Sequence, residues 1–142
     1  MPTTVTIQRS DVRSLLFAES TNASRTFTRN DGVSEFDKIV IDEQVDQSLD
    51  GSWMEAKSKL EEKMHEFISS SLYSSYQSIT FTFKADAVPA GLTDNIKMYI
   101  VDYMMQDWLA SVRPDYRQRY IDRANFEMDD LLRKLYKKES PV

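Results

Sequence analysis

Apolar side chains recur at helical spacing through most of the last third of the chain. From Thr93 to Val112 they lie nearly all round the predicted helix, whereas from residue 114 to Leu135 they form a single stripe. Arg113-Pro114 separates the two patterns, and proline suits the first turn of a helix, where its missing N–H is not needed. The pattern predicts two long helices, capped at Thr93 and joined with almost no loop. The first is apolar enough to be either the centre of a bundle or a helix covered by neighbouring subunits.

A second amphipathic pattern predicts a helix over residues 53–73. Its apolar positions recur every three or four residues, while Glu and Lys cover the other side. Ser52 and Glu55 have the spacing of a capping box, in which each side chain bonds a free backbone N–H of the first helical turn. The preceding Asp50-Gly51 is expected to end the segment before this helix.

Strict alternation of polar and apolar residues over 78–84 predicts a β-strand. One strand cannot satisfy its own backbone groups, so it needs a partner. The candidates are the N-terminal segment 4–8, the region around Ile39, or a strand of another chain. Pairing within the chain is favoured because open strand edges promote aggregation, and Phe81 and Phe83 remain candidates for contact with another subunit.

The first third of the chain has weaker patterns. Residues 4–7 alternate as a short strand, and Ser10 is placed to cap a helix over 11–19. Residues 20–32 have the composition of an exposed loop; we favour a mobile surface loop, and an N-terminal arm is the alternative. Residues 34–49 fit a strand or one helical face, and we favour helix or mixed structure.

Together these elements predict a mainly α fold, a small bundle of about four helices with a short β element near 78–84 that pairs with an N-terminal strand. The 142 residues are expected to form one domain, with an arm and short helix (1–32), a long helix and strand (33–92), a helical pair (93–138) and a tail (139–142). The predicted core residues are Trp53, Leu60, Met64, Phe67, Ile100, Tyr103, Met104, Trp108, Tyr120, Leu131 and Leu135.

Composition excludes several classes of function. A net charge of -5 argues against broad binding to duplex DNA, which depends on cationic side chains. The absence of cysteine excludes disulfides and thiolate chemistry. The N-terminus lacks the features of a secretory signal, and the longest apolar window, residues 96–109, is too short and too polar to cross a membrane.

Candidate catalytic groups are few. His65 is the one histidine, and it lies among Glu61, Glu62 and Glu66 on the charged side of its predicted helix. A catalytic or metal-binding role would need a partner cluster from another copy, so we interpret His65 as a solvated side chain. No nucleophile with a base, metal-ligand set or phosphate loop is evident, and the sequence predicts no enzyme activity and no cofactor.

Charge is distributed unevenly along the chain. Between Asp31 and Glu66 the acidic residues outnumber Lys and Arg by eleven to four, whereas four arginines gather near the start of the last helix. Ordinary surface charge accounts for such a distribution; in the alternative interpretation, an acidic surface of one subunit meets a basic surface of the next in a ring. The predicted interface residues are Arg113, Arg117, Arg119, Arg123, Asp42, Glu43 and Asp46, with Phe81 and Phe83 on the strand.

The last fifty residues resemble the C-terminal helical pair of neck proteins from tailed bacteriophages, the head-to-tail connector or adaptor group. The resemblance lies in the segments Ile96–Leu109 and Arg113–Tyr120, in Ala124, in Leu131–Leu135 and in Pro141. It implies a virion protein, made in the host cytoplasm, that forms a ring with copies of itself. Its further partners would be the portal, tail or neck proteins, and DNA that passes without sequence-specific binding. The family supplies no catalytic residues to this chain.

Two alternatives stay open. The helix over 53–73 and the Phe81–Phe83 strand do not align with adaptors, so the chain is also interpreted as a tail terminator or tail-completion protein. In a different class, it would be a non-viral cytosolic interaction module that binds a partner helix in a groove beside Trp108 and Met104.

Overall fold

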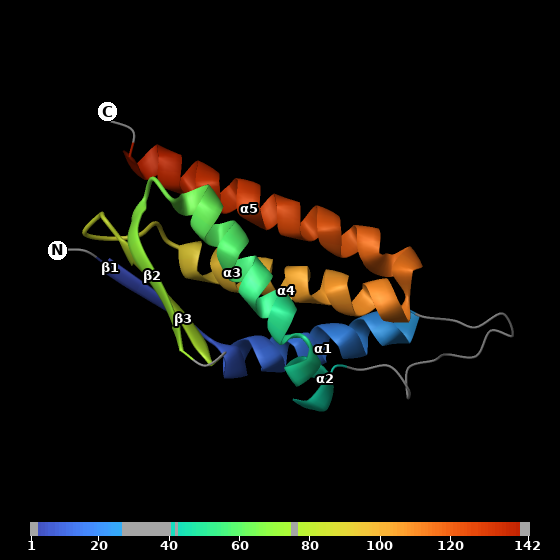
Figure 1. Ribbon diagram of the computed structural model, residues 1–142. Helices are drawn as coiled ribbons and strands as arrows, with labels where there is room; N and C mark the ends of the chain where they lie inside the picture. Colours follow the sequence, from blue (N-terminus) through green and yellow to red (C-terminus); the bar gives the residue numbers. More distant parts are fainter. Residues whose placement is uncertain (1–2, 27–40, 42, 75–76, 140–142) are drawn as a thin grey trace, which may run out of the picture.

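Five α-helices and three β-strands make up the described part of the chain, residues 3–26, 41, 43–74 and 77–139 of a computed structural model. The elements in order are β1 (Thr3–Gln8), α1 (Arg9–Thr26), α2 (Glu43–Ser48), α3 (Asp50–Met64), β2 (Ile68–Ser74), β3 (Ser78–Phe83), α4 (Leu92–Val112), the 3-10 turn η2 (Pro114–Tyr116) and α5 (Arg117–Glu139) (Figure 1). The predicted class, mainly helical with a small β element, is confirmed.

Helix α4 is the centre of the helical part. It packs against α1, α3, α5 and β1, and Figure 1 shows it lying between α1 and α5 with α3 crossing it. Its apolar side chains are needed on several sides at once, which explains why its sequence is apolar nearly all round. The fully buried ones include Ile96, Ile100, Val101, Met104, Met105 and Leu109.

The three strands form an antiparallel sheet in the order β1-β3-β2. Val5 pairs with Phe81 and Ile7 with Ile79 in the β1–β3 ladder, and these residues are buried on one face of the sheet. The other face carries hydroxyls, with Thr6 and Thr80 hydrogen-bonded at 2.9 Å. The predicted pairing of the 78–84 strand with the N-terminal strand is confirmed. Its second partner, β2, was not predicted.

The helix predicted over 53–73 is wrong beyond Met64, where α3 ends. Phe67 and Ser71 continue the three- and four-residue spacing, but residues 68–74 form β2 instead. The segment gains backbone hydrogen bonds by pairing with β3, a partner that the local spacing does not reveal. A backbone bond from Lys84 N to Phe67 O, 3.0 Å long, extends this contact.

The predicted capping box is also wrong. Helix α3 begins at Asp50, with Leu49 in the capping position and no side-chain cap, so Gly51 lies inside the helix. The hydroxyl of Ser52 donates to Asp107 on α4. Glu55 accepts a 2.8 Å hydrogen bond from the Tyr103 hydroxyl, also on α4. Both capping residues bond α4 rather than their own helix start.

Helix α1 is longer than predicted and begins at Arg9, directly after β1, so Ser10 lies within it and is not its cap. The predicted loop at 20–32 is wrong for residues 20–26, which are helical. Ser20 and Ala23 are buried there, and the Ser20 hydroxyl accepts a 2.8 Å bond from the backbone N–H of Ile41. Residues 27–32 lie outside the described residues, as do 34–40 and 42 of the ambiguous segment, whereas 43–48 form α2.

The two ends of α4 are defined by backbone geometry. Gly91 precedes the helix with φ of 83°, a left-handed conformation that glycine adopts without strain. The helix thus starts one residue before Thr93, the predicted cap. At the other end, Arg113 breaks the helix with φ of -148°, and Pro114 opens η2 before α5, which confirms the predicted break.

Helix α5 carries the predicted apolar stripe along α4 and reaches back to the sheet end of the molecule. Tyr136, in its last turns, packs edge-on against Phe67 with ring centroids 5.0 Å apart. The predicted core residues are buried, except that Tyr103 is half-buried with its hydroxyl on Glu55.

Candidate subunit interface

The four arginines predicted to form one basic surface are used in two different ways. Arg113 is largely internal: its guanidinium donates to both carboxylate oxygens of Asp115, at 3.1 and 3.0 Å, and lies 4.7 Å from the ring centre of Tyr116. The hydrogen bond from Arg113 lowers the pKa of Asp115. These contacts hold the corner between α4 and α5, so Arg113 is not available to a partner.

Arg123 is also committed within the chain. It donates two hydrogen bonds to the carboxylate of Glu19 on α1, at 3.3 and 3.2 Å, and lies 3.6 Å from Asp102 on α4. Its guanidinium is 5.0 Å from the ring centre of Tyr120. Arg123 therefore ties α5 to α1 and α4.

Arg117 and Arg119 differ from this pair. Both are exposed in the first turn of α5, and neither forms a hydrogen bond or ion pair with any residue that the structure describes. Figure 1 shows the start of α5 at the end of the molecule opposite the sheet. We call these two residues the basic tip.

The acidic residues predicted for the interface do not form an exposed acidic surface in the described residues. Asp46 is 1% exposed and holds Arg9 and Arg13 through its two oxygens, at 3.3 and 2.9 Å. Its assignment to an interface is therefore wrong, because a buried, doubly paired carboxylate cannot meet another chain. Asp42 lies outside the described residues, and Glu43 lies in α2 with a side chain that is not described.

Phe81 and Phe83 are likewise not surface residues. They are 0% and 1% exposed on the inner face of the central strand β3. Period-two alternation places both side chains on the same face, and that face packs into the core of this chain. The prediction that they contact another subunit is wrong.

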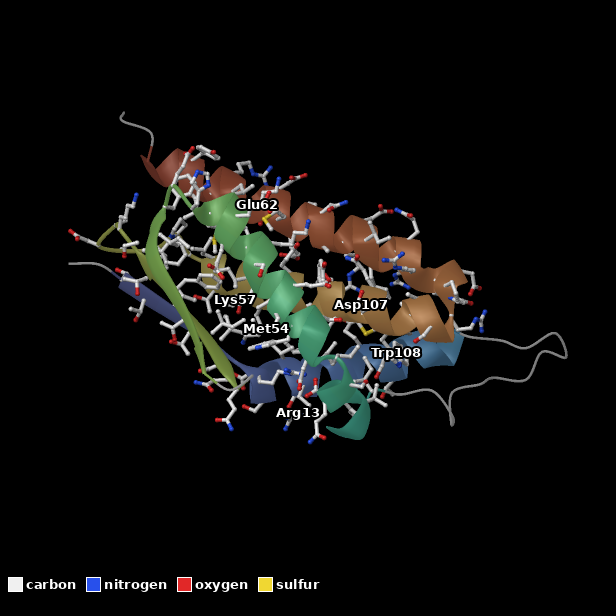
Figure 2. The ribbon with its side chains drawn as sticks, viewed as in Figure 1. Arg13, Met54, Lys57, Glu62, Asp107 and Trp108 are labelled. Carbon is white, nitrogen blue, oxygen red and sulfur yellow. The ribbon has the colours of Figure 1, made fainter. Side chains whose placement is uncertain are left out.

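A cleft that the sequence did not reveal lies where α2 and α3 meet the last turns of α4. Its volume is about 520 Å³, and its walls come from Val45, Ser48, Leu49, Gly51, Ser52, Glu55, Asp107, Trp108 and Ser111. In Figure 2, Asp107 and Trp108 lie on α4 beside the start of α3. We call this the Glu55–Asp107 cleft.

The Glu55–Asp107 cleft is electrostatically negative. Its lining holds two carboxylates and no lysine or arginine, and the C-terminal end of α4, with its negative end of the helix dipole, forms one wall. Leu49 and Trp108 give it an apolar floor, since both are mostly buried. Such a lining suits a cationic group with an apolar stem.

Hydrogen bonds hold the two carboxylates in place. Asp107 accepts from Ser52, and Glu55 accepts from Tyr103 at 2.8 Å. Burial of the Tyr103 hydroxyl, together with its bond to Glu55, raises the pKa of this tyrosine well above its usual value. Tyr103 thus stays protonated as a donor and keeps the carboxylate oriented.

Sequence reasoning missed this cleft because its two acidic residues are 52 positions apart and belong to different helices. Trp108 was singled out as the wall of a groove, and it does line the cleft. Met104, the other expected wall, is fully buried. In the sequence, Ser52 and Glu55 have the spacing of a capping box, so no sequence signal assigns them to a cleft.

The described residues contain no group of three or more His, Cys, Asp or Glu side chains arranged to hold a metal ion. His65 is exposed, with Nδ1 2.9 Å from the Glu62 carbonyl oxygen of its own helix end. None of the described helices has the length and apolarity needed to span a membrane.

Comparison of this chain with protein-family models, with curated protein sequences and with solved structures found no match.

Proposed function

We propose that the chain is a structural subunit of a tailed-bacteriophage neck, where copies of it form a ring that joins the portal and head to the tail and lets DNA pass. The observation that carries the proposal is the charge complementarity of the exposed Arg117 and Arg119 and the two carboxylates that line the Glu55–Asp107 cleft. Two complementary surfaces on one chain allow head-to-tail contacts, and such contacts form a ring where the rotation between neighbouring copies closes.

The resemblance of the last fifty residues to neck proteins supports placing this ring in a phage particle. The net charge of -5 is also compatible with a channel for DNA. A predominantly acidic wall repels the phosphate backbone, so DNA slides past it without being retained.

The experiment that tests this function is quantitative mass spectrometry of tailed-phage particles from the organism that carries the gene. We expect this chain at a copy number equal or simply related to that of the portal protein. A particle fraction that contains portal and tail proteins but lacks this chain would contradict the proposal.

Within the neck, an adaptor and a tail terminator or tail-completion protein occupy different positions. Cross-linking of intact particles followed by mass spectrometry separates them. An adaptor is expected to cross-link to the portal, whereas a terminator is expected to cross-link to the tail tube.

The second candidate, an interaction module that binds one partner helix, is favoured by one observation. The cleft beside Trp108, about 520 Å³ in volume, includes the apolar side chains of Val45, Leu49 and Trp108, and an apolar groove can receive side chains of a partner helix. A module of this kind would remain monomeric and bind one partner in a one-to-one ratio. Sedimentation of the purified chain distinguishes it from a ring subunit.

A further inference from the structure

We propose that a second cleft, between α3, α4 and α5, binds an organic carboxylate that carries an apolar group. Its volume is about 240 Å³. We call it the Lys59–Lys63 cleft, and the side chains that decide its chemistry are Lys59, Lys63, Tyr99, Ile121, Ala124 and Met128. The proposal goes beyond the ring, because it concerns a ligand and does not depend on contact between copies.

The packing of three helices explains why this cleft exists. Helices α3 and α5 both lie on α4, and Figure 1 shows α3 crossing α4 beside α5. In the described residues α3 and α5 make little direct contact with each other. The space between them is therefore a groove with α4 at its floor, α3 on one side and α5 on the other.

The α3 side of the cleft is positively charged. Lys59 and Lys63 are both exposed and lie one helical turn apart, so they share one face of the helix. Neither forms an ion pair or hydrogen bond with any residue that the structure describes. Like charges at this spacing repel each other, and the described lining contains no acidic residue. An anion between the two lysines would relieve the repulsion and accept charge-assisted hydrogen bonds.

The floor of the cleft adds a neutral donor, the hydroxyl of Tyr99. Tyr99 is 6% exposed, yet its hydroxyl forms no hydrogen bond within the described part of the chain. Burial raises the pKa of Tyr99 to about 12, so the hydroxyl keeps its proton. Tyr103 also lines the cleft, but its hydroxyl already donates to Glu55. A carboxylate in the cleft supplies the acceptor that Tyr99 lacks.

The α5 side of the cleft is apolar and selects the rest of the ligand. Ile121, Ala124 and Met128 recur at helical spacing, and the last two are 2% and 7% exposed. Such a wall suits an apolar group, and the thioether of a methionine packs favourably on an aromatic ring. A strongly hydrated inorganic anion gains nothing from it.

The size of the cleft limits the ligand to a small group. About 240 Å³ corresponds to roughly eight water molecules at about 30 Å³ each, and it is smaller than the roughly 300–1,000 Å³ of drug-sized pockets. The same chemistry is offered by a free aromatic or branched carboxylate and by the C-terminal apolar residue of a partner protein.

The test is an NMR titration of the full chain with isotopically labelled methionine methyl groups. The probe is phenylacetate, compared with the neutral phenylethanol, the cationic phenethylamine and inorganic phosphate. Phenylacetate is expected to shift the Met128 resonance to saturation and to leave that of Met105, which is fully buried and outside the cleft lining, unchanged. The other three probes are expected to bind at least about tenfold more weakly.

Two variants test the donors. Lys59→Gln with Lys63→Gln should weaken phenylacetate binding at least about tenfold, because both cationic donors are lost. Tyr99→Phe should weaken it at least about threefold and leave stability in urea unchanged, since the hydroxyl has no partner to lose within the described residues. The matched control is Lys84→Gln, which removes an exposed lysine outside the cleft lining and should bind as the natural chain does.

A short peptide that ends in phenylalanine separates the two sources of the carboxylate. Tighter binding of this peptide than of phenylacetate, lost in its C-terminal amide, would identify the end of a partner protein as the ligand. Weaker binding than phenylacetate would identify a small molecule.

Three results would overturn the inference. These are the lack of a saturable Met128 shift with either carboxylate at millimolar concentration, equal or tighter binding of phenylethanol or phosphate, or unchanged binding by the lysine and tyrosine variants. A chain that is missing from phage particles but binds phenylacetate would contradict the neck function alone.

Discussion

Two arginine clusters, each with at least one buried carboxylate, fasten α1 to the rest of the molecule, and they differ in charge balance. At the start of α1, the Arg9 cluster joins Arg9 and Arg13 to the carboxylates of Asp46 and Asp50. Further along α1, the Arg123 cluster joins one guanidinium to two carboxylates, Glu19 and Asp102. The first cluster has equal numbers of positive and negative groups, whereas the second has an excess negative charge.

Each of the three guanidinium nitrogens of Arg9 has a polar partner. Its side chain is 4% exposed, with 3.3 Å to Asp46 Oδ1, 2.6 Å to the Asp46 carbonyl oxygen and 3.0 Å to Asp50 Oδ1. The Trp53 ring centre lies 5.1 Å from the guanidinium. A buried ion pair is tolerated when the remaining donors are hydrogen-bonded, and this cluster meets that condition.

In the Arg123 cluster, by contrast, one buried polar atom lacks a hydrogen bond. Asp102 is 1% exposed, and its Oδ1 atom, 3.6 Å from Arg123, has no hydrogen bond within the described residues. Burial raises the pKa of Asp102 to about 7; Arg123 opposes this shift, and the negative charges of Glu19 and Glu127 add to it. Burial of Asp102, with a smaller contribution from the excess negative charge, thus raises its pKa to a value near neutral pH.

The largest expected effect comes from breaking the balanced cluster. Arg9→Met leaves the buried Asp46 with the half-exposed Arg13 as its remaining cationic partner. Removing one member of a buried pair costs about 3–5 kcal/mol in the free energy of unfolding. Urea unfolding at neutral pH measures this change.

Arg13→Met is the matched control, because Arg13 contacts the same Asp46 but is 39% exposed. We expect its cost to stay below about 1 kcal/mol. Equal losses for the two variants would show that burial of the guanidinium is not what makes the Arg9 cluster important.

The next effect concerns the unbalanced cluster and depends on pH. Because the pKa of Asp102 is raised from 3.8 to about 7 on folding, the folded state binds more protons in this range, and stability falls as pH rises from about 4 to 7. Asp102→Asn removes this component. We expect the variant to be more stable than the natural chain by about 1–3 kcal/mol at pH 8 and nearly equal to it at pH 4.

Thermal or urea unfolding at a series of pH values measures both curves. A natural chain whose stability shows no decline between pH 4 and 7 would mean that Asp102 is solvated and not perturbed. A variant that is less stable at pH 8 would mean that the ion pair with Arg123 outweighs the cost of burial.

The smallest expected effect comes from a variant in which the Arg123 cluster has equal numbers of positive and negative groups. Glu19→Gln leaves Arg123 with one carboxylate partner, so the Arg123 cluster then resembles the Arg9 cluster in charge. We expect a cost of about 0.5–1.5 kcal/mol from the weakened hydrogen bonds and a lower pKa for Asp102, because a like charge is removed. The pH at which stability declines should move downward, and no movement would argue against the coupling.

The sequence patterns predicted the parts of the fold that depend on neighbouring residues. Alternation over 78–84 identified β3, and Pro114 marked the break between α4 and α5. Patterns failed where a distant partner decides the structure. Residues 68–74 continue a helical spacing but pair with β3, and Ser52 has the spacing of a cap but bonds Asp107.

The candidate interface shows the same limit. Four arginines close together in the sequence look equivalent. In the structure, however, Arg123 forms ion pairs with Glu19 and Asp102, and Arg113 forms one with Asp115. Glu19 is 104 positions from Arg123, so the sequence offered no means of separating the committed arginines from Arg117 and Arg119. Likewise, Asp46 looked like part of an acidic surface because its partners Arg9 and Arg13 precede it by more than thirty residues.

The course of α5 makes the molecule convenient to label. From Arg117 in the basic tip to Tyr136 beside Phe67, α5 rises about 28 Å at 1.5 Å per residue. The chain contains no cysteine, so a single cysteine introduced at the exposed Tyr136 or at Gln118 would carry a fluorophore at a known position. Energy transfer between copies labelled at opposite ends of this helix would then report how neighbouring subunits are oriented.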